Sequence, residues 1–212
     1  GRHPPAPIEP RSGQGLNAPA AERNAEAILS VLRAHAPARG DVLEVAAGTG
    51  QHAPPVAVAL PGLNWTPSDP SPEALASIEA WRVQSGAANL AAPVGLDCLD
   101  ETTWPTASFD VVYCANMTHI SPWSATEGLM RLAGRRLRAP GGLLALYGPY
   151  LEAGISPAPS NAAFDASLKA RDAAWGLRDR DAVVAQARSE GLALTLRVEM
   201  PANNLMLLFR HM

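Results

Sequence analysis

A glycine loop, followed after one more apolar segment by an acidic residue, is the first feature of the sequence that could do chemistry. Residues 41–46 form a short apolar run, typical of a buried strand, that leads into Gly48-Thr-Gly50. Glycine has no Cβ, so such a loop can turn sharply and let its backbone approach a ligand closely. Asp69 stands 19 residues beyond Gly50, after the next apolar run, where a carboxylate can hold ribose hydroxyls. These residues predict a nucleotide-type cofactor site.

Two cofactor classes use this layout, and other residues discriminate between them. The glycine loop fits the dinucleotide fingerprint G-x-G-x-x-G/A, but a nicotinamide enzyme also needs residues for hydride transfer. A tyrosine with a lysine four residues later is the usual pair in short chains; Lys169 is the only lysine, and no tyrosine precedes it at that spacing. S-adenosylmethionine requires an acid before the glycine loop and acids after the second and third strands, where Glu44, Asp69 and Asp97 stand. We therefore favour S-adenosylmethionine and keep a nicotinamide-dependent oxidoreductase as an alternative.

Strand-like and helix-like segments alternate along the chain, and their order predicts the fold. Apolar runs indicate strands at residues 41–46, 63–67, 90–96, 109–115 and 143–148, with helical segments between them. Two further helices follow residue 150, and two β-rich runs at 192–199 and 204–209 most simply pair as a hairpin. We predict an α/β, Rossmann-like, seven-stranded and mostly parallel sheet with helices on both faces and a C-terminal antiparallel hairpin. Ligands bind such sheets beyond the carboxyl ends of the strands.

Capping residues indicate where the helices begin. A helix is expected from Ala20, and Ser71-Pro-Glu73 has the order of a helix start: a cap, a proline in the first turn and an acid near the positive end. Further caps are expected at Ser121-Pro122, at Ser160 or Asn161, and at Asp179.

Composition and charge narrow the class of protein. The 212 residues carry 17 basic and 20 acidic side chains, so the net charge of −3 differs from the basic excess of a general nucleic-acid binder. Two cysteines are too few for a disulfide framework or a four-thiolate zinc site, and no apolar run is long enough for a membrane span. Residues 1–20 form a Pro/Gly-rich N-terminal arm ahead of a single domain at 21–212. They lack the apolar stretch of a secretory signal, and we expect a cytoplasmic protein.

Several blocks of the sequence resemble a known family. Residues 42–52 are similar to motif I of class I S-adenosylmethionine-dependent methyltransferases, and residues 19–210 resemble, more closely, the methyltransferase-like 26 family, formerly a domain of unknown function. The matching blocks are Glu22-Arg-Asn24, Val42-Leu-Glu-Val-Ala-Ala-Gly-Thr-Gly-Gln-His52, Pro67-Ser-Asp-Pro70, Asn116-Met-Thr-His-Ile-Ser-Pro-Trp123, Tyr147-Gly-Pro149, Ser160-Asn-Ala-Ala-Phe-Asp165, Trp175-Gly-Leu-Arg-Asp179 and Glu199-Met-Pro-Ala-Asn-Asn204. The resemblance implies the Rossmann-like fold and S-adenosylmethionine as cofactor, but no particular substrate. The resemblance also implies that residues 21–212 form a methyltransferase domain.

The resemblance also implies which residues contact the cofactor. Asp69 matches the ribose-binding acid, and Asp97 with Cys98 matches the adenine side. Ala46 is a departure, because many methyltransferases have glycine there. The expected cofactor-binding residues are Asn24, Glu44, Ala46, Gly48, Thr49, Gly50, Asp69, Pro70, Asp97, Cys98, Asn116 and Met117.

Methyl transfer requires the protein to hold donor and acceptor in line, and a general base helps when the acceptor must lose a proton. His119, just beyond the fourth strand, is the best-placed catalytic base because imidazole titrates near neutrality; a structural role for it in its loop is the alternative. The expected substrate-binding residues are His119, Trp123, Tyr147, Asn161 and Asn203. No potential ligands have the short spacing of a metal site, so we expect no metal.

The sequence thus predicts an S-adenosylmethionine-dependent methyltransferase that acts on a small-molecule acceptor, with specialised metabolism as its expected setting. We expect no nucleic-acid or membrane partner. Two alternatives stay open: a protein that binds S-adenosylmethionine without transferring its methyl group, and the nicotinamide-dependent oxidoreductase.

Overall fold

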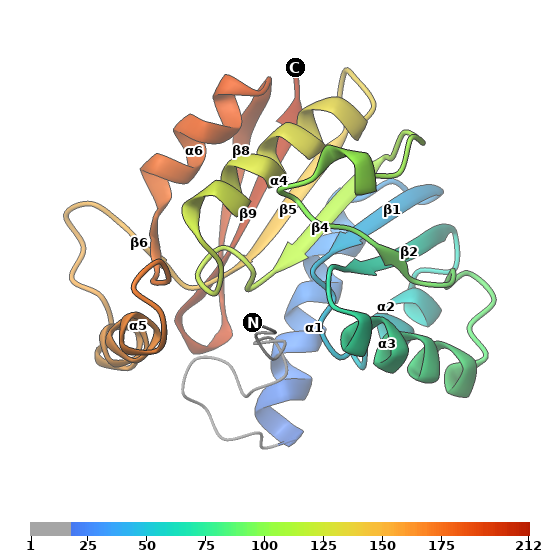
Figure 1. Ribbon diagram of the computed structural model, residues 1–212, viewed down its shortest axis with the longest axis horizontal. Coiled ribbons are helices and arrows are strands. Elements are labelled where there is room, and N and C mark those ends of the chain that lie inside the picture. The colour runs from blue at the N-terminus through green and yellow to red at the C-terminus, as the bar shows by residue number, and fades with distance from the viewer. Residues whose placement is uncertain (1–17) are drawn as a thin grey trace.

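A single mixed sheet forms the centre of the computed structural model, which describes residues 18–212. Its seven strands follow the spatial order β3-β2-β1-β4-β5-β9-β8 (Figure 1). Neighbouring strands from β3 to β5 are parallel, whereas β9 runs antiparallel to both β5 and β8. The strands are β1 (Gly40–Val45), β2 (Leu63–Asp69), β3 (Val94–Gly95), β4 (Val111–Ala115), β5 (Leu143–Gly148), β8 (Leu192–Met200) and β9 (Asn204–His211). The predicted fold class, including the C-terminal antiparallel pair, is confirmed.

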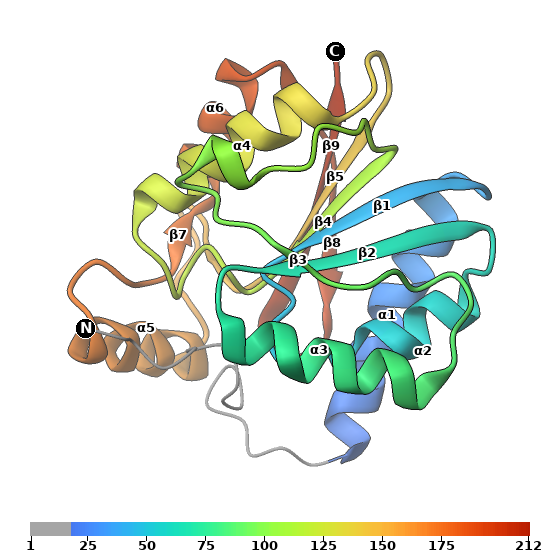
Figure 2. The same ribbon diagram turned by 45° about the vertical axis from the view of Figure 1, so that its right-hand side comes forward.

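Helices cover both faces of this sheet (Figure 2). One face carries α1 (Ala18–His35), α2 (Ala53–Ala59) and α3 (Pro72–Ser85), and the other carries α4 (Trp123–Arg136) and α6 (Arg180–Ser189). Successive strand residues point to opposite faces, so each strand contributes to two apolar cores. Val42 packs in the core that includes Leu32 of α1, whereas Leu43 packs in the core that includes Leu129 of α4. None of the helices within residues 18–212 is both long and apolar enough to cross a membrane.

The parallel register brings the carboxyl ends of β1 to β4 to one edge of the sheet. Glu44 in β1 lies opposite Pro67 in β2 and Tyr113 in β4, and Asp69 at the end of β2 lies opposite Gly95 in β3. The loops that follow these strands therefore open on the same edge, which is where ligands bind in open α/β sheets.

The α5 helix (Pro159–Arg171) belongs to neither helix layer. It lies beyond the edge of the sheet where β5 ends, beside the 3₁₀ turn η4 (Pro201–Asn203) that joins β8 to β9 (Figure 1). Two short parallel strands, β6 (Tyr150–Leu151) and β7 (Arg178–Asp179), form a second sheet next to α5, and neither strand was predicted. A further 3₁₀ turn, η3 (Glu101–Thr103), follows β3.

Some predicted element boundaries differ from the structure: β4 begins at Val111 and not at residue 109, α5 begins at Pro159, and the third strand and α1 differ as follows. Residues 90–96 contain only the two-residue β3 and an isolated bridge from Leu90 to Trp65, because Pro93 has no backbone N–H to pair. The first helix begins at Ala18, so the last three residues of the predicted arm are helical. The rest of that arm lies outside the described residues.

Two of the four predicted helix caps are confirmed. The Ser71 hydroxyl accepts the Ala74 N–H at 3.3 Å, and the Asp179 carboxylate accepts the Ala182 N–H at 3.0 Å. The other two predictions are wrong: the residues at the cap positions of α4 and α5 are Pro122 and Ala158, which form no side-chain cap.

Candidate functional site

The glycine loop and the acid at the end of β2 are joined by a hydrogen bond. The Gly48 N–H donates to Oδ2 of Asp69 at 3.0 Å, and the Ser71 N–H donates to Oδ1 at 3.0 Å. The Asp69 residue is only 2% exposed. Burial raises the pKa of Asp69, and the two N–H donors act in the opposite direction. Each carboxylate oxygen retains a second lone pair, so the group can still accept hydroxyl donors from a ligand.

The backbone of the loop takes the left-handed conformation at three positions. The φ angles are +57° at Ala46, +65° at Gly48 and +81° at Gly50. Gly50 is required for packing as well, because a Cβ there would lie 2.7 Å from Cα of Ile78 in α3. The Ser77 hydroxyl, also from α3, donates to the Thr49 carbonyl at 2.7 Å. The loop is therefore shaped by contacts with α3 and with Asp69.

The Glu44 carboxylate is buried under the same loop. The Trp65 indole N–H donates to Oε1 of Glu44 at 3.0 Å, and the Ser68 hydroxyl donates to the Glu44 carbonyl at 2.7 Å. The indole of Trp65 is tilted against the ring of Tyr113, with the ring centroids 5.8 Å apart. The hydrogen bond from the Trp65 indole orients the carboxylate of Glu44, which lies one residue before the end of β1.

Asp97 and Cys98 lie in the turn after β3. Oδ1 of Asp97 accepts the Leu99 N–H at 2.9 Å, and the Asp97 carbonyl accepts the Trp104 indole N–H at 2.9 Å. Burial raises the pKa of Cys98 to about 12, with a further contribution from the charge of Asp97. The thiol therefore stays protonated, which excludes a thiolate nucleophile here. Gly128 of α4 has no Cβ, which allows the helix to pack directly on the Cys98 backbone.

The segment after β4 crosses the end of β5. Asn116 has a φ of +64° and donates its N–H to the Tyr147 carbonyl at 2.8 Å, and both residues are buried. The carbonyl of Met117 accepts the Ser121 hydroxyl at 2.7 Å. A Cβ at Gly148 would lie 3.4 Å from Oδ1 of Asn116, so the backbone of Gly148 packs close to the asparagine side chain.

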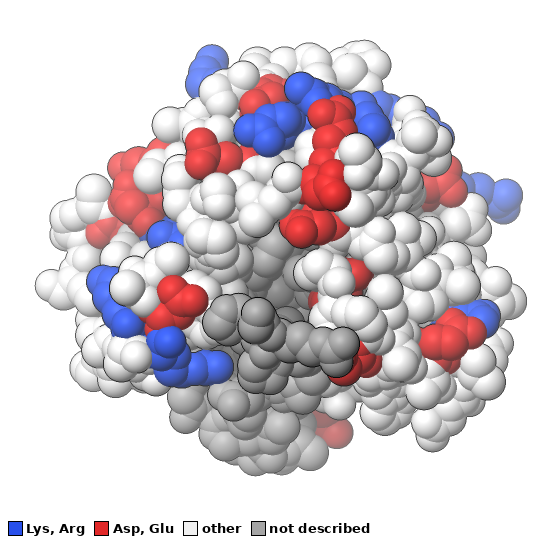
Figure 3. Space-filling model, in the orientation of Figure 1, with Lys and Arg blue, Asp and Glu red and all other residues white. Residues whose placement is uncertain are grey.

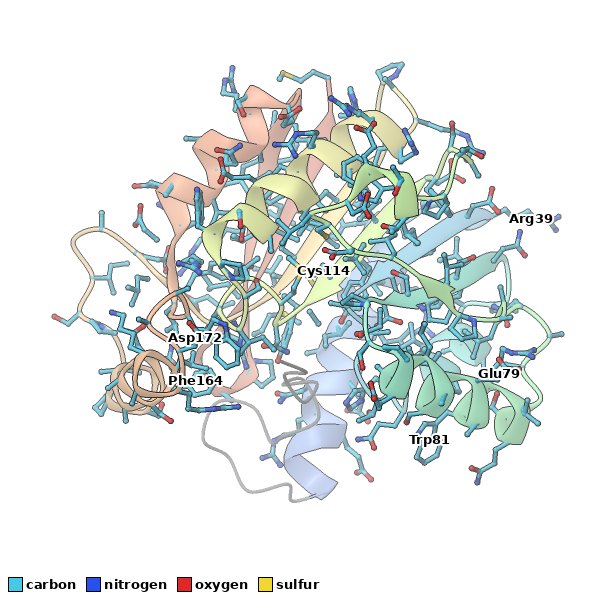
Figure 4. All side chains as sticks on the ribbon, in the orientation of Figure 1. Arg39, Glu79, Trp81, Cys114, Phe164 and Asp172 are labelled. Atoms are coloured by element: carbon cyan, nitrogen blue, oxygen red, sulfur yellow. The ribbon has the colours of Figure 1, made fainter. Side chains whose placement is uncertain are left out.

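His119 is enclosed between the end of β5 and α5. It is 1% exposed, and its ring meets the Phe164 ring edge-on, with the centroids 5.4 Å apart and an interplanar angle of 71°. Figure 4 shows Phe164 on the side of α5 that faces the body of the molecule. The position of a Cβ at Gly148 would be 3.7 Å from the imidazole, so the side chains of Asn116 and His119 both approach the same side of Gly148.

Three asparagines gather where α5 meets η4. The Asn161 amide donates to the Asn203 carbonyl at 3.1 Å, and the Asn204 amide donates to the Pro201 carbonyl at 3.0 Å. These donors fix the two amide orientations, and both Oδ1 atoms are buried without a hydrogen-bond partner within residues 18–212. Ala202 and Asn203 have φ angles of +60° and +59°. A buried acceptor without a hydrogen-bond partner costs free energy, and so does left-handed backbone at a residue other than glycine. Such features concentrate at ligand sites.

The remaining expected site residues are dispersed. Asn24 is half-buried on α1, a helix that contacts η4, and Pro70 is exposed after Asp69. The indole of Trp123 is half-buried at the start of α4, and the guanidinium of Arg178 lies over it at 5.8 Å. From the sequence, Asn204 was expected to lie over the pocket together with Asn161 and Asn203, whereas Phe164 and Arg178 were assigned no role. Phe164 follows Asn161 by three residues and therefore shares its helix face, a signal that could have been used.

Charge is mixed around this site. On the face drawn in Figure 3, basic and acidic side chains of the described residues are interspersed, without a broad patch of one sign. Among residues 18–212, no group of three or more His, Cys, Asp or Glu side chains is arranged to hold a metal ion.

The sheet order and the antiparallel β9 define the Rossmann-like fold of methyltransferases, and three solved structures of low sequence identity share it. An O-methyltransferase family protein from Burkholderia thailandensis is 16% identical, with a TM-score of 0.74 over 88% of this chain and 56% of that one. CalO1, a methyltransferase in calicheamicin biosynthesis solved in its SAH-bound form, is 20% identical, with a TM-score of 0.73 over 92% and 54%. An O-methyltransferase family 2 protein from Planctomyces limnophilus, in complex with apigenin, is 19% identical, with a TM-score of 0.76 over 92% and 58%.

Residues 16–211 match the family model described as "Protein of unknown function (DUF938)", and the chain belongs to this family. It spans little more than half the length of the three solved structures. At these identities the likeness establishes the fold, and the activity has to be argued from the site.

Proposed function

We propose that the protein is an S-adenosylmethionine-dependent methyltransferase that acts on a small-molecule acceptor. The observation that carries the proposal is the bond between the Gly48 N–H and the Asp69 carboxylate, which joins a left-handed glycine loop to a buried acid at the carboxyl end of the sheet. Methyltransferases share the fold around this pair. The relation to the methyltransferase-like 26 family and a cytoplasmic setting in specialised metabolism belong to the same proposal.

The chain's own groups fit this cofactor by their chemistry. Carboxylates suit the amino, ribose and adenine groups of S-adenosylmethionine, and Glu44, Asp69 and Asp97 stand at the ends of three adjacent strands. The indole N–H of Trp65 donates to one oxygen of Glu44 and so orients this carboxylate near the end of β1. When bound, S-adenosylmethionine supplies a methyl group activated by a sulfonium.

The residues beyond β4 and β5 supply the other half of the proposed site. His119 would receive the proton of an acceptor that must lose one, and its burial against Phe164 keeps bulk water away from the imidazole. The buried Oδ1 atoms of Asn161 and Asn204 would accept N–H or O–H donors of the acceptor. The side chains of Asn161, Asn204 and Phe164 carry no charge, which suits an uncharged acceptor group.

The antiparallel β9 argues against the nicotinamide alternative. In the dinucleotide-binding fold that uses G-x-G-x-x-G, the sheet is parallel through its sixth strand. Here β9 returns beside β5 in the opposite direction, and α5 with η4 lies above it.

Calorimetric titration tests the proposal. S-adenosylhomocysteine, the product of the cofactor, should bind with a stoichiometry of one, and NADH should not bind. Asp69→Asn keeps the shape of the side chain but removes its charge, and we expect at least a tenfold weaker affinity, on the order of 1.4 kcal/mol. Asp181→Asn, an exposed substitution at the start of α6, is the matched control and should bind as the wild type does. Binding of NADH alone would favour the oxidoreductase, and binding of neither would overturn the proposal.

A further inference from the structure

The segment Trp175-Gly-Leu-Arg-Asp179 has no part in the proposed chemistry, yet it is built against the loop that carries His119. The Leu177 N–H donates to Oδ1 of Asp165 in α5 at 2.9 Å, and Arg178 begins β7. Gly176 has a φ of +150°, and a Cβ there would lie 2.9 Å from the same Asp165 oxygen. The close approach of this segment to α5 therefore depends on glycine.

Arg178 binds the His119 loop on both sides of the histidine. Its Nε donates to the Thr118 carbonyl at 2.9 Å, and its Nη2 donates to the Ser121 carbonyl at 2.7 Å. Nη2 also donates to the Ala174 carbonyl at 2.8 Å, in its own segment. The guanidinium lies over the Trp123 ring at 5.8 Å, so its plane is fixed by packing as well.

A second link passes directly to His119. The Gly176 N–H donates to the His119 carbonyl at 3.0 Å, and the ring of Phe164 in α5 contacts the imidazole. Arg178 and Gly176 thus bind backbone carbonyls of residues 118–121. The His119 ring contacts Phe164 of α5, and α5 is itself bonded to residues 175–179 through Asp165.

The first part of the loop is held differently. Asn116 donates its N–H to the Tyr147 carbonyl, so the position of this residue depends on the pairing of β4 with β5. Asn116 is therefore supported by the sheet, whereas residues 118–121 are supported mainly by Arg178 and Gly176, and the Met117 carbonyl links the two parts by accepting the Ser121 hydroxyl.

We propose that Arg178 is a positioning residue that fixes His119 against Phe164 by binding the carbonyls of Thr118 and Ser121. Arginine suits this task because its planar guanidinium presents several N–H donors at fixed angles, whereas a lysine ammonium is a single point charge on a flexible stem. The consequence for catalysis, namely that Arg178 would hold the base His119 in place, rests on the proposed function. The positioning of His119 by Arg178 does not depend on it.

The test compares Arg178→Gln and Arg178→Lys with the wild type. Arg180→Gln is the matched control, because Arg180 stands two residues further along and is bound to Glu152 at 3.0 Å. Two readouts report on the loop: the NMR resonances of the His119 imidazole, displaced by the ring current of Phe164, and hydrogen exchange of the Gly176 amide. Calorimetry with S-adenosylhomocysteine reports on the cofactor half.

In both Arg178 variants we expect the His119 resonances to lose the Phe164 displacement and the Gly176 amide to exchange about tenfold faster or more. Affinity for S-adenosylhomocysteine should stay within about threefold of the wild type. Arg180→Gln should leave the His119 and Gly176 readouts unchanged. If Arg178→Gln does not fold, Arg178→Lys, which keeps the charge and stem, supplies the same comparison.

Unchanged His119 resonances in the folded Arg178→Lys protein would overturn the proposal, and so would equal changes in Arg180→Gln. Failure of the wild type to bind S-adenosylhomocysteine would instead refute the proposed function. The NMR comparison needs no cofactor, so the two failures are distinguishable.

Discussion

Ala46 occupies a backbone conformation that glycine adopts more easily, and Ala46→Gly should therefore stabilise the protein. Its φ of +57° lies in the left-handed region, which disfavours a residue with a Cβ by about 1–2 kcal/mol. Glycine removes that strain but makes the unfolded chain more flexible, which offsets about 0.4–1 kcal/mol. The net gain should be about 0.5–1 kcal/mol, or roughly 1–4 °C in Tm for a chain of this size.

Thermal and urea unfolding of Ala46→Gly measure this gain, and Ala47→Gly is the matched control. Ala47 is buried in the same loop, and its φ is not positive. Glycine at this position should lower the stability by about 1 kcal/mol, because the flexibility of the unfolded chain rises without relief of strain. Equal destabilisation by both substitutions would refute the left-handed assignment at Ala46 and, with it, the shape of the proposed cofactor loop.

Three further predictions follow from the burial of named groups. Because burial raises the pKa of Asp69, its carboxylate takes up a proton at a higher pH than an ordinary aspartate does. Affinity for S-adenosylhomocysteine should fall as the pH is lowered toward that pKa, and calorimetry across pH should show no such fall in Asp69→Asn. Gly128→Ala would drive a methyl group into the Cys98 backbone, so urea unfolding should show a loss of about 1–3 kcal/mol; a value near zero would count against this packing. Cys98 and Cys114 are both buried, and a thiol reagent at pH 8 should label neither in the native protein and both in urea; labelling before unfolding would contradict the burial of these thiols.

The positions of most strands along the chain were predictable because each is a short apolar run that ends at turn residues. The two confirmed helix caps follow the same logic: Ser71 and Asp179 each directly precede the first helical residue. The predicted cap at Ser121 failed because Pro122 takes the cap position and the serine hydroxyl bonds to Met117 instead. β6 and β7 have two residues each, too few for a periodic pattern.

The candidate site was predictable to the extent that parallel strands bring their carboxyl ends together. That rule predicts from the sequence alone that Glu44, Asp69 and Asp97 lie at one edge of the sheet. The bond from Gly48 to Asp69 and the contacts of Arg178 depend on how loops distant in the sequence pack, and single-sequence patterns carry no such information. The roles assigned to His119 and to the asparagines stay predictions.

Backbone amide resonances report most directly on the proposed cofactor site, because backbone N–H groups donate to the proposed cofactor-binding carboxylates. Two of them are the amides of Gly48, bonded to Asp69, and of Leu99, bonded to Asp97. The Ala182 amide makes an equivalent bond to Asp179 at the start of α6 and serves as the internal reference. On titration with S-adenosylhomocysteine, we expect saturable shifts of the Gly48 and Leu99 resonances and none at Ala182. Unmoved Gly48 and Leu99 resonances at saturating ligand would contradict the proposed cofactor site.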